Sequence, residues 1–160
     1  MPSTRPTNIQ QQRALVALTA LRVVVGGVFA VHGWAKLTDI AGTAQSFQSL
    51  GMPAPQAMVY LAIAGELFGG VGLALGFLTR VAALGPVCTM LVAIITVHAG
   101  HGLLAKNGGF EYPMVLFFAS AFFAVNGAGR LSVDAALERR VAISARRPPR
   151  MRMQIPSQPL

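Results

Sequence analysis

Four long apolar stretches alternate with short polar segments along the chain. They cover about residues 14–34, 57–77, 81–99 and 113–128. A helix needs about 20 apolar residues to cross the hydrocarbon core of a bilayer. The first three stretches reach about this length, and the shorter fourth can span if the bilayer thins locally. The pattern therefore predicts four transmembrane helices.

The connections between these stretches predict an up-down-up-down four-helix bundle. Little more than Leu78-Thr79-Arg80 joins the second and third spans, so these two must be antiparallel neighbours. The first connection has its own apolar residues at helical spacing: Ile40, Ala44, Phe47 and Leu50. We expect a short amphipathic helix there, ended by Gly51 and Pro53 and lying on the membrane surface.

Three regions follow from these boundaries. We expect an N-terminal tail over residues 1–13, a four-helix transmembrane domain over 14–138, and a basic, disordered tail over 139–160. Ser132 is placed to cap a short amphipathic segment at the end of the domain.

Composition supports an integral membrane protein. Of the 160 residues, 54% are hydrophobic and only 11% are charged, whereas about one quarter of a soluble domain is charged. This balance argues against a water-soluble globule and a largely disordered chain. The single cysteine excludes an internal disulfide framework and a cysteine-based structural zinc site.

The distribution of charge predicts the orientation. Ten of the 13 Lys and Arg residues fall on one side of the predicted bundle. These ten are Arg5, Arg13, Arg80, Arg130, Arg139, Arg140, Arg146, Arg147, Arg150 and Arg152. The positive-inside rule then places both termini in the cytoplasm. The basic tail either contacts anionic lipid head groups or only fixes topology, and no groove-reading module supports a nucleic-acid partner.

Two opposite charges lie inside the predicted spans. Arg22 and Glu66 fall close to the midpoints of the first and second spans. Because a lone charge at the centre of a spanning helix is costly, each should find a partner inside the bundle. We predict a buried ion pair between Arg22 and Glu66, acting either as a structural pin or in binding and catalysis.

Small residues support a close contact between the first two spans. Helical spacing aligns the following glycines: Gly26 and Gly33 in the first span, and Gly65, Gly69, Gly72 and Gly76 in the second. Such stripes let helix backbones approach closely in lipid.

Polar residues gather at the predicted outer end of the bundle. They are His32, Lys36, His98, His101 and Glu111. If the bundle closes, these side chains converge and could bind a quinone head group, a metal or a small anion. Interfacial residues of this kind are also often simply solvated, and the His-x-x-His spacing is a weak signal. We therefore assign no metal site.

The order and spacing of these landmarks resemble the DoxX family of small bacterial membrane proteins. The matching segments run from Arg22 to Asp134. They include His32-Gly33-x-x-Lys36-Leu37, Leu50-Gly51-Met52-Pro53, Leu75-Gly76-x-x-Thr79-Arg80 and Gly127-x-Gly129-x-x-Ser132-x-Asp134. The resemblance implies a multi-pass protein of the bacterial inner membrane with four spans. It also implies an association with quinone, sulfur or oxidative-stress metabolism.

Three functions stay open on this basis. The first is a redox-linked membrane subunit, an oxidoreductase component acting with quinone or a partner protein, because the chain carries no evident cofactor motif. The second is a non-catalytic scaffold that anchors soluble redox enzymes at the cytoplasmic face. The third is a small-solute carrier, which would need homo-oligomers because four short helices enclose little volume.

Overall fold

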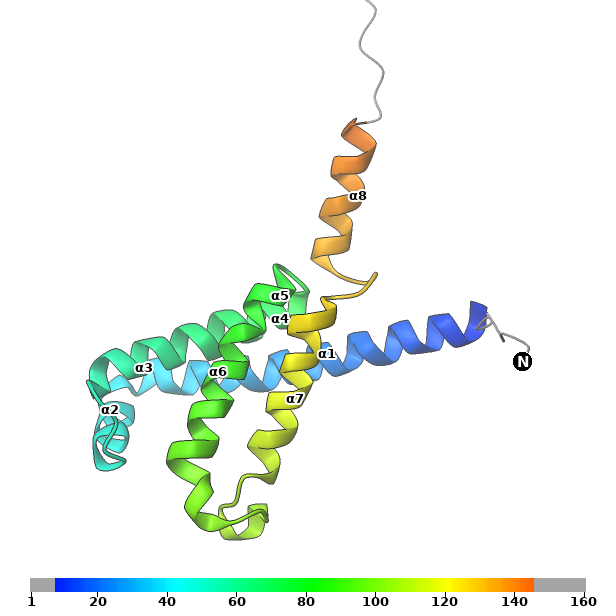
Figure 1. The fold of residues 1–160 in the computed structure, drawn as a ribbon. Helices are drawn as coiled ribbons and strands as arrows, with labels where there is room; N and C mark the ends of the chain where they lie inside the picture. The colour runs from blue at the N-terminus through cyan, green and yellow to red at the C-terminus, as the bar shows by residue number, and fades with distance from the viewer. Residues whose placement is uncertain (1–7, 146–160) are drawn as a thin grey trace, which may run out of the picture.

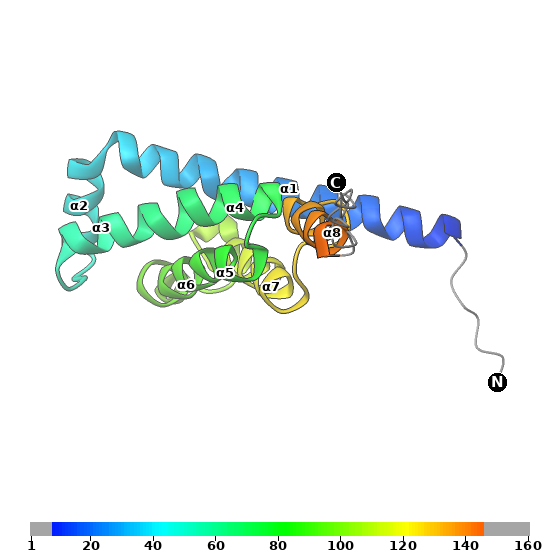
Figure 2. The same ribbon diagram turned by 90° about the horizontal axis from the view of Figure 1, so that it is seen from above.

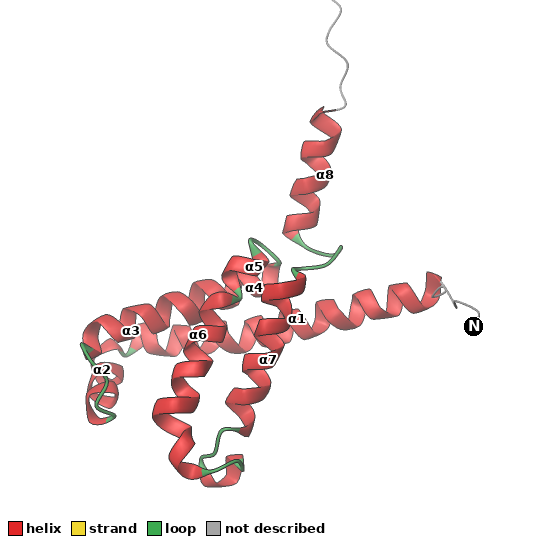
Figure 3. Ribbon diagram, in the orientation of Figure 1, coloured by secondary structure: helices red, strands yellow, loops and turns green. Residues whose placement is uncertain are grey.

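The computed structural model describes residues 8–145, and within them every regular element is helical (Figures 1 and 3). Within residues 8–145, three continuous helical segments are long and apolar enough to cross a membrane: Asn8–Thr38, Pro55–Leu75 and Thr79–His101. The helix Glu111–Asn126 is also apolar but has only 16 residues, about 24 Å of rise. The expected all-helical membrane protein is thus supported, while the fourth crossing, the cytoplasmic termini and the homo-oligomer stay predictions.

The elements follow one another with short connections. In order they are α1 (Asn8–Thr38), α2 (Ile40–Ser49), α3 (Pro55–Ile63), η1 (Ala64–Phe68), α4 (Gly69–Leu75), α5 (Thr79–Ala82), α6 (Leu84–Ala93), η2 (Ile94–His98), η3 (Ala99–His101), η4 (Ala105–Asn107), α7 (Glu111–Asn126) and α8 (Val133–Ala145). Two of them, η1 and η2, are single π-helical turns: η1 joins α3 to α4, and η2 follows α6 and precedes the 3-10 turn η3. Such turns insert a residue into the helical repeat and are frequent at functional sites.

The helices form two antiparallel pairs that cross steeply. The first pair is α1 with α3–α4, and the second is α6 with α7 (Figures 1 and 2). This steep crossing differs from the nearly parallel or antiparallel helices of a four-helix bundle. Glycines explain how the pairs approach so closely: a Cβ on Gly85 of α6 would lie 2.5 Å from the carbonyl oxygen of Gly65.

A compact apolar core lies where the two pairs cross. It contains Val25, Phe29, Leu73, Ala83, Leu116 and Phe123, which are all buried. These residues come from α1, α4, α7 and the α5–α6 junction, so one core fixes both pairs. Most other large apolar side chains are exposed on the outside of the helices, as expected for a surface that faces lipid.

The short helix predicted between the first two spans is present as α2. Asp39 caps it by accepting a hydrogen bond from the Gly42 amide at 2.9 Å, and Gly51, at φ 71°, follows its end. Its apolar stripe packs on α3, with Ala44 buried against Val59 and Ile63. The predicted helix is therefore confirmed, and its stripe has a partner within the protein.

The ends of the domain differ from the prediction. Helix α1 begins at Asn8, within the predicted N-terminal tail, and α8 continues to Ala145. The expectation of disorder is therefore wrong for residues 139–145, and residues 146–160 lie outside the described part of the chain. The predicted cap is confirmed, because the Ser132 hydroxyl accepts a hydrogen bond from the Ala135 amide at 3.1 Å.

Candidate functional site

A buried carboxylate marks the interior of the first helix pair. Glu66, on the π-helical turn η1, is only 5% exposed. Its Oε2 lies 2.5 Å from the Nζ of Lys36, near the end of α1. The lysine side chain is 21% exposed, so its ammonium reaches inward from the rim of the fold. The two residues form a charge-assisted hydrogen bond, which is stronger than a neutral one.

The predicted ion pair between Arg22 and Glu66 is wrong. Arg22 is buried, at 2% exposure, but it donates hydrogen bonds to backbone carbonyl oxygens. Its Nη1 lies 3.0 Å from the Leu73 oxygen and its Nη2 lies 2.8 Å from the Leu131 oxygen. Both intramembrane charges do find partners, as expected, but not each other.

The register of the two helices explains this correction. A Cβ at Gly33 would lie 2.4 Å from the Leu67 nitrogen, so Gly33 is opposite Leu67. Arg22 precedes Gly33 by 11 residues, which places it about 16 Å further along α1. Their positions near the midpoints of the two spans predict similar depths for the two charges, which this register contradicts. Glycine contacts, and not equal lengths, set the register.

Arg22 instead belongs to a polar cluster at the α8 end of the fold. Asp134, near the start of α8, accepts hydrogen bonds from the Leu78 amide at 2.7 Å and from the Thr79 amide at 3.0 Å and hydroxyl at 2.8 Å. Its own amide donates to the Gly76 carbonyl oxygen at 2.9 Å. This cluster ties α8 to the turn between α4 and α5.

The cluster also sets the ionisation of Asp134. Burial by itself would raise the pKa of Asp134. The hydrogen bonds from Thr79 and Leu78, together with the positive charge of Arg22, outweigh burial and hold the pKa below its usual value. Asp134 is therefore a stable anion under the turn, and sequence analysis missed it because its partners are 55 and 56 residues away.

The predicted glycine stripes are both packed, but against different helices. Gly26 and Gly33 of α1 face the second helical segment, where a Cβ on Gly26 would lie 2.5 Å from the Ala74 nitrogen. The second segment turns its stripe the other way: the nearest atoms to Gly65, Gly69 and Gly72 come from Gly85, Thr89, Pro86, Ala82 and Phe77. Its close contact with α1 uses Gly70, which lies outside the glycine stripe predicted from the sequence.

Gly76 differs from the other glycines of its stripe because it lies at a helix end. It ends α4 with φ at 70°, a left-handed conformation that favours glycine. The Arg22 guanidinium occupies the space where its side chain would be. Gly76 therefore ends α4 and, because it has no side chain, leaves space for the Arg22 guanidinium.

A cavity of about 660 Å³ opens beside the Lys36–Glu66 pair. It lies between α1, α3, η1, α6 and the start of α7. Most of its wall is apolar, with Phe29, Met58, Leu61, Val92 and Leu116 among the lining residues. The polar groups in the wall are few: His32, Lys36, Glu66, Cys88, Thr89, His98 and Tyr112. An apolar cavity with a few convergent polar groups is typical of a small-molecule site.

The structure brings together part of the predicted polar group. His32, Lys36 and His98 line the cavity, whereas His101 and Glu111 do not. Glu111 accepts a hydrogen bond from the Ala105 amide, and His101 pairs with the Val97 carbonyl oxygen, so both stabilise the loop before α7. Within residues 8–145 no group of three His, Cys, Asp or Glu side chains could hold a metal ion.

The two π-helical turns both contribute to this cavity. Gly65 and Glu66 lie on η1, while Val97 and His98 lie on η2. The His98 ring nitrogen Nδ1 lies 2.6 Å from the Gly108 carbonyl oxygen, which holds the ring in place. No residue spacing in the sequence revealed these turns, although both of them supply residues that line the cavity.

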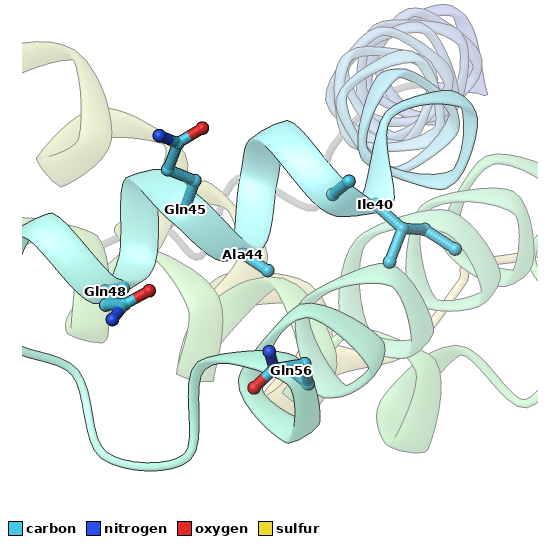
Figure 4. Close-up of a pocket in the computed structure, with 6 residues that line it drawn as sticks. Ile40, Ala44, Gln45, Gln48 and Gln56 are labelled. Carbon is cyan, nitrogen blue, oxygen red and sulfur yellow. The ribbon is translucent and has the colours of Figure 1, made fainter.

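A second, smaller hollow of about 440 Å³ lies between α2 and the start of α3. Figure 4 shows Ile40 and Ala44 together with Gln45, Gln48 and Gln56 around it. Its lining includes amides but no ionisable side chain. The Glu66 cavity is therefore the stronger candidate for chemistry.

The geometry defines a helical membrane protein with a polar pair inside an apolar cavity, and comparison with known proteins identifies its family. Residues 17–99 match the DoxX family model. The chain is 37% identical over 114 residues to a Bacillus subtilis (strain 168) protein named "Putative oxidoreductase CatD", covering 71% of this chain and 81% of that protein. The chain belongs to the DoxX family.

Two relatives from Escherichia coli (strain K12) support the membrane assignment. Inner membrane protein YqjF is 28% identical over 125 residues, 78% of this chain and 95% of that protein. Inner membrane protein YphA is 31% identical over 127 residues, 74% of this chain and 89% of that protein. No solved structure matches the chain significantly.

Proposed function

We propose that this DoxX protein is a redox-linked subunit of the bacterial inner membrane that binds a quinone-class molecule in the Glu66 cavity. The observation that carries the proposal is the buried Lys36–Glu66 pair in an apolar cavity of about 660 Å³. Small-molecule sites usually enclose about 300–1,000 Å³, so a quinone ring and the start of its tail fit this volume.

The polar groups match the chemistry of such a ring. A quinone presents two carbonyl oxygens that accept hydrogen bonds, and the Lys36 ammonium carries three donors. The Glu66 carboxylate can accept a hydrogen bond from the hydroxyl of the reduced form. The apolar lining supplied by residues such as Phe29 and Leu116 would contact the ring and tail.

The same groups could handle protons. Reduction of a quinone to its hydroquinone takes two electrons and two protons. His32 and His98 line the cavity with Glu66, and the ring nitrogens of histidine can donate or accept a hydrogen bond. The electrons would come from a sulfur compound or a soluble partner enzyme. The name of the Bacillus subtilis relative, "Putative oxidoreductase CatD", supports this redox assignment.

The single cysteine of the chain makes a direct binding assay available. Cys88 lines the cavity and is exposed there. We expect decylubiquinone to slow N-ethylmaleimide labelling of Cys88 in the detergent-solubilised protein at least five-fold, measured by intact-mass spectrometry. Solvent extraction of the purified protein should also release co-purified quinone in near-stoichiometric amount.

A matched pair of variants tests the role of the carboxylate. Glu66→Gln should abolish both the protection and the co-purified quinone, whereas Glu138→Gln, which removes a carboxylate from exposed α8, should keep both. If no quinone is extracted and none protects Cys88, the proposal is wrong. A quinone-free protein that retains a soluble enzyme through residues 139–160 would instead support the scaffold function.

A further inference from the structure

Helix α8 carries large apolar side chains that the rest of the fold leaves exposed. Leu137, Val141 and Ile143 are 45%, 70% and 65% exposed. Figure 1 shows α8 leaving the body of the protein, to which the hydrogen bonds around Asp134 attach its first turn. A helix of 13 residues is marginal in water without a surface to cover its apolar side. The apolar side chains of α8 therefore need a surface that covers them.

The charge around these apolar residues is basic. Arg139 and Arg140 lie on α8, and Arg130 precedes it. The Arg139 guanidinium donates to the Arg130 carbonyl oxygen at 2.8 Å, which holds the two segments together. The sequence then adds Arg146, Arg147, Arg150 and Arg152 after the helix. Of the two acidic residues on α8, Asp134 is already engaged by Leu78 and Thr79.

The start of α8 lies at a membrane boundary. Asp134 binds the turn between α4 and α5, and Gly127 ends α7 nearby, with the Arg80 side chain 3.5 Å from the position of a Cβ on Gly127. Irregular backbone that joins spanning helices lies outside the hydrocarbon core unless protein buries it. Helix α8 therefore begins next to the lipid head groups of one leaflet.

We propose that α8 is a binding element for anionic phospholipid, with its apolar side chains at the head-group boundary and its arginines on lipid phosphates. Arginine is suited to this contact because its guanidinium binds phosphate bidentately. Arg140, which lies among the apolar side chains by helical position, can extend its charged end toward the phosphates while its stem stays apolar. A surface helix that carries both apolar and basic side chains binds a bilayer in this way.

Fluorescence in nanodiscs tests the proposal on the full chain. In a Cys88→Ser background, Leu137→Cys or Ala142→Cys is labelled with an environment-sensitive probe. The two positions lie about 140° apart around the helix. With 30% phosphatidylglycerol in phosphatidylcholine, we expect the probe at 137 to shift to the blue and brighten about two-fold, and the probe at 142 to change little. These changes are measured relative to nanodiscs of pure phosphatidylcholine.

Charge-loss variants supply the matched control. Arg140→Gln should reduce the phosphatidylglycerol-dependent brightening at 137 by at least half. Arg13→Gln, which removes one exposed arginine from α1, should leave it unchanged. High salt should weaken the effect, since it screens exposed charges.

Three results would overturn the proposal. Equal emission in neutral and anionic nanodiscs would mean that α8 does not recognise anionic lipid. A blue shift of the probe at 137 only when each disc holds two copies would mean that the exposed apolar side chains of α8 contact a second copy of this chain. A blue shift only on addition of a soluble protein would assign it to that protein. None of these outcomes depends on whether the Glu66 cavity binds quinone.

Discussion

Replacing Lys36 should show how much the Lys36–Glu66 pair contributes to the stability of the protein. The Glu66 side chain is 6% exposed and that of Lys36 is 21% exposed. Breaking a fully buried pair costs about 3–5 kcal/mol, because the remaining charge is left without a partner, whereas an exposed pair contributes about 0–1 kcal/mol. Between these limits, we expect Lys36→Met to lower the free energy of unfolding by about 2–4 kcal/mol.

The reverse change should cost less. Glu66→Gln leaves the lysine ammonium, which can extend toward the rim on its flexible stem, so we expect a loss of about 1–2 kcal/mol. In the double variant no unpaired charge remains. It should therefore be more stable than the sum of the single losses predicts, with a coupling energy of about 2 kcal/mol.

Reversible unfolding by sodium dodecyl sulfate in mixed micelles, followed by circular dichroism, measures these differences. Lys106→Met, at an exposed lysine, is the control and should change stability by less than about 0.5 kcal/mol. If the two changes at Lys36 and Glu66 are additive within about 0.5 kcal/mol, the pair makes no energetic contribution and the reasoning fails.

Three further predictions concern the helix contacts and the α8 end. Gly26→Ala should destabilise by about 2 kcal/mol, since its Cβ would lie 2.5 Å from a backbone nitrogen of α4, while Gly27→Ala, with nothing within 4 Å, should be neutral or stabilising in the same unfolding assay. Arg22→Met and Glu66→Gln should be additive within about 0.5 kcal/mol; a coupling above 1 kcal/mol would restore the pairing that the structure contradicts. Asp134→Asn should lower stability at pH 7 by about 2 kcal/mol through weaker hydrogen bonds. The folded-state pKa of Asp134 is lowered, so its contribution is complete above the unfolded pKa of about 3.9 and is lost as the pH falls through the folded pKa. The melting temperatures of wild type and Asp134→Asn should therefore converge below about pH 4. A difference in melting temperature that stays constant with pH would contradict the stabilising role of the ionised Asp134 carboxylate.

The sequence predicted the polar residues of the site better than their contacts. His32, Lys36, His98 and Glu66 were all singled out, and all four line the cavity. Their grouping was wrong, because Glu66 was paired with Arg22 and left out of the set that contains Lys36. The motif Gly33-x-x-Lys36 held a usable signal: a glycine that closely contacts the second span brings the lysine one turn later to the same side.

Local chemistry explains what the sequence determined by itself. Apolar runs of about 20 residues must form helices in lipid, because every backbone group needs an internal hydrogen bond there. Asp39 and Ser132 fix helix starts through contacts with amides three residues away. The helix predicted between the first two spans also depends on local spacing, and α2 is where it was expected.

The tertiary structure decided everything that depends on register between helices. Two stripes of small residues fit together in several ways, so spacing alone could not show that Gly70, and not Gly65 or Gly69, approaches α1. This register places Glu66 beside Lys36, and it places Arg22 beside the carbonyl oxygens of Leu73 and Leu131. The same register also sets where the π-helical turns lie beside the cavity. Helix packing in lipid is set by close contact between backbones and not by the hydrophobic pattern, so the sequence pattern could not show this.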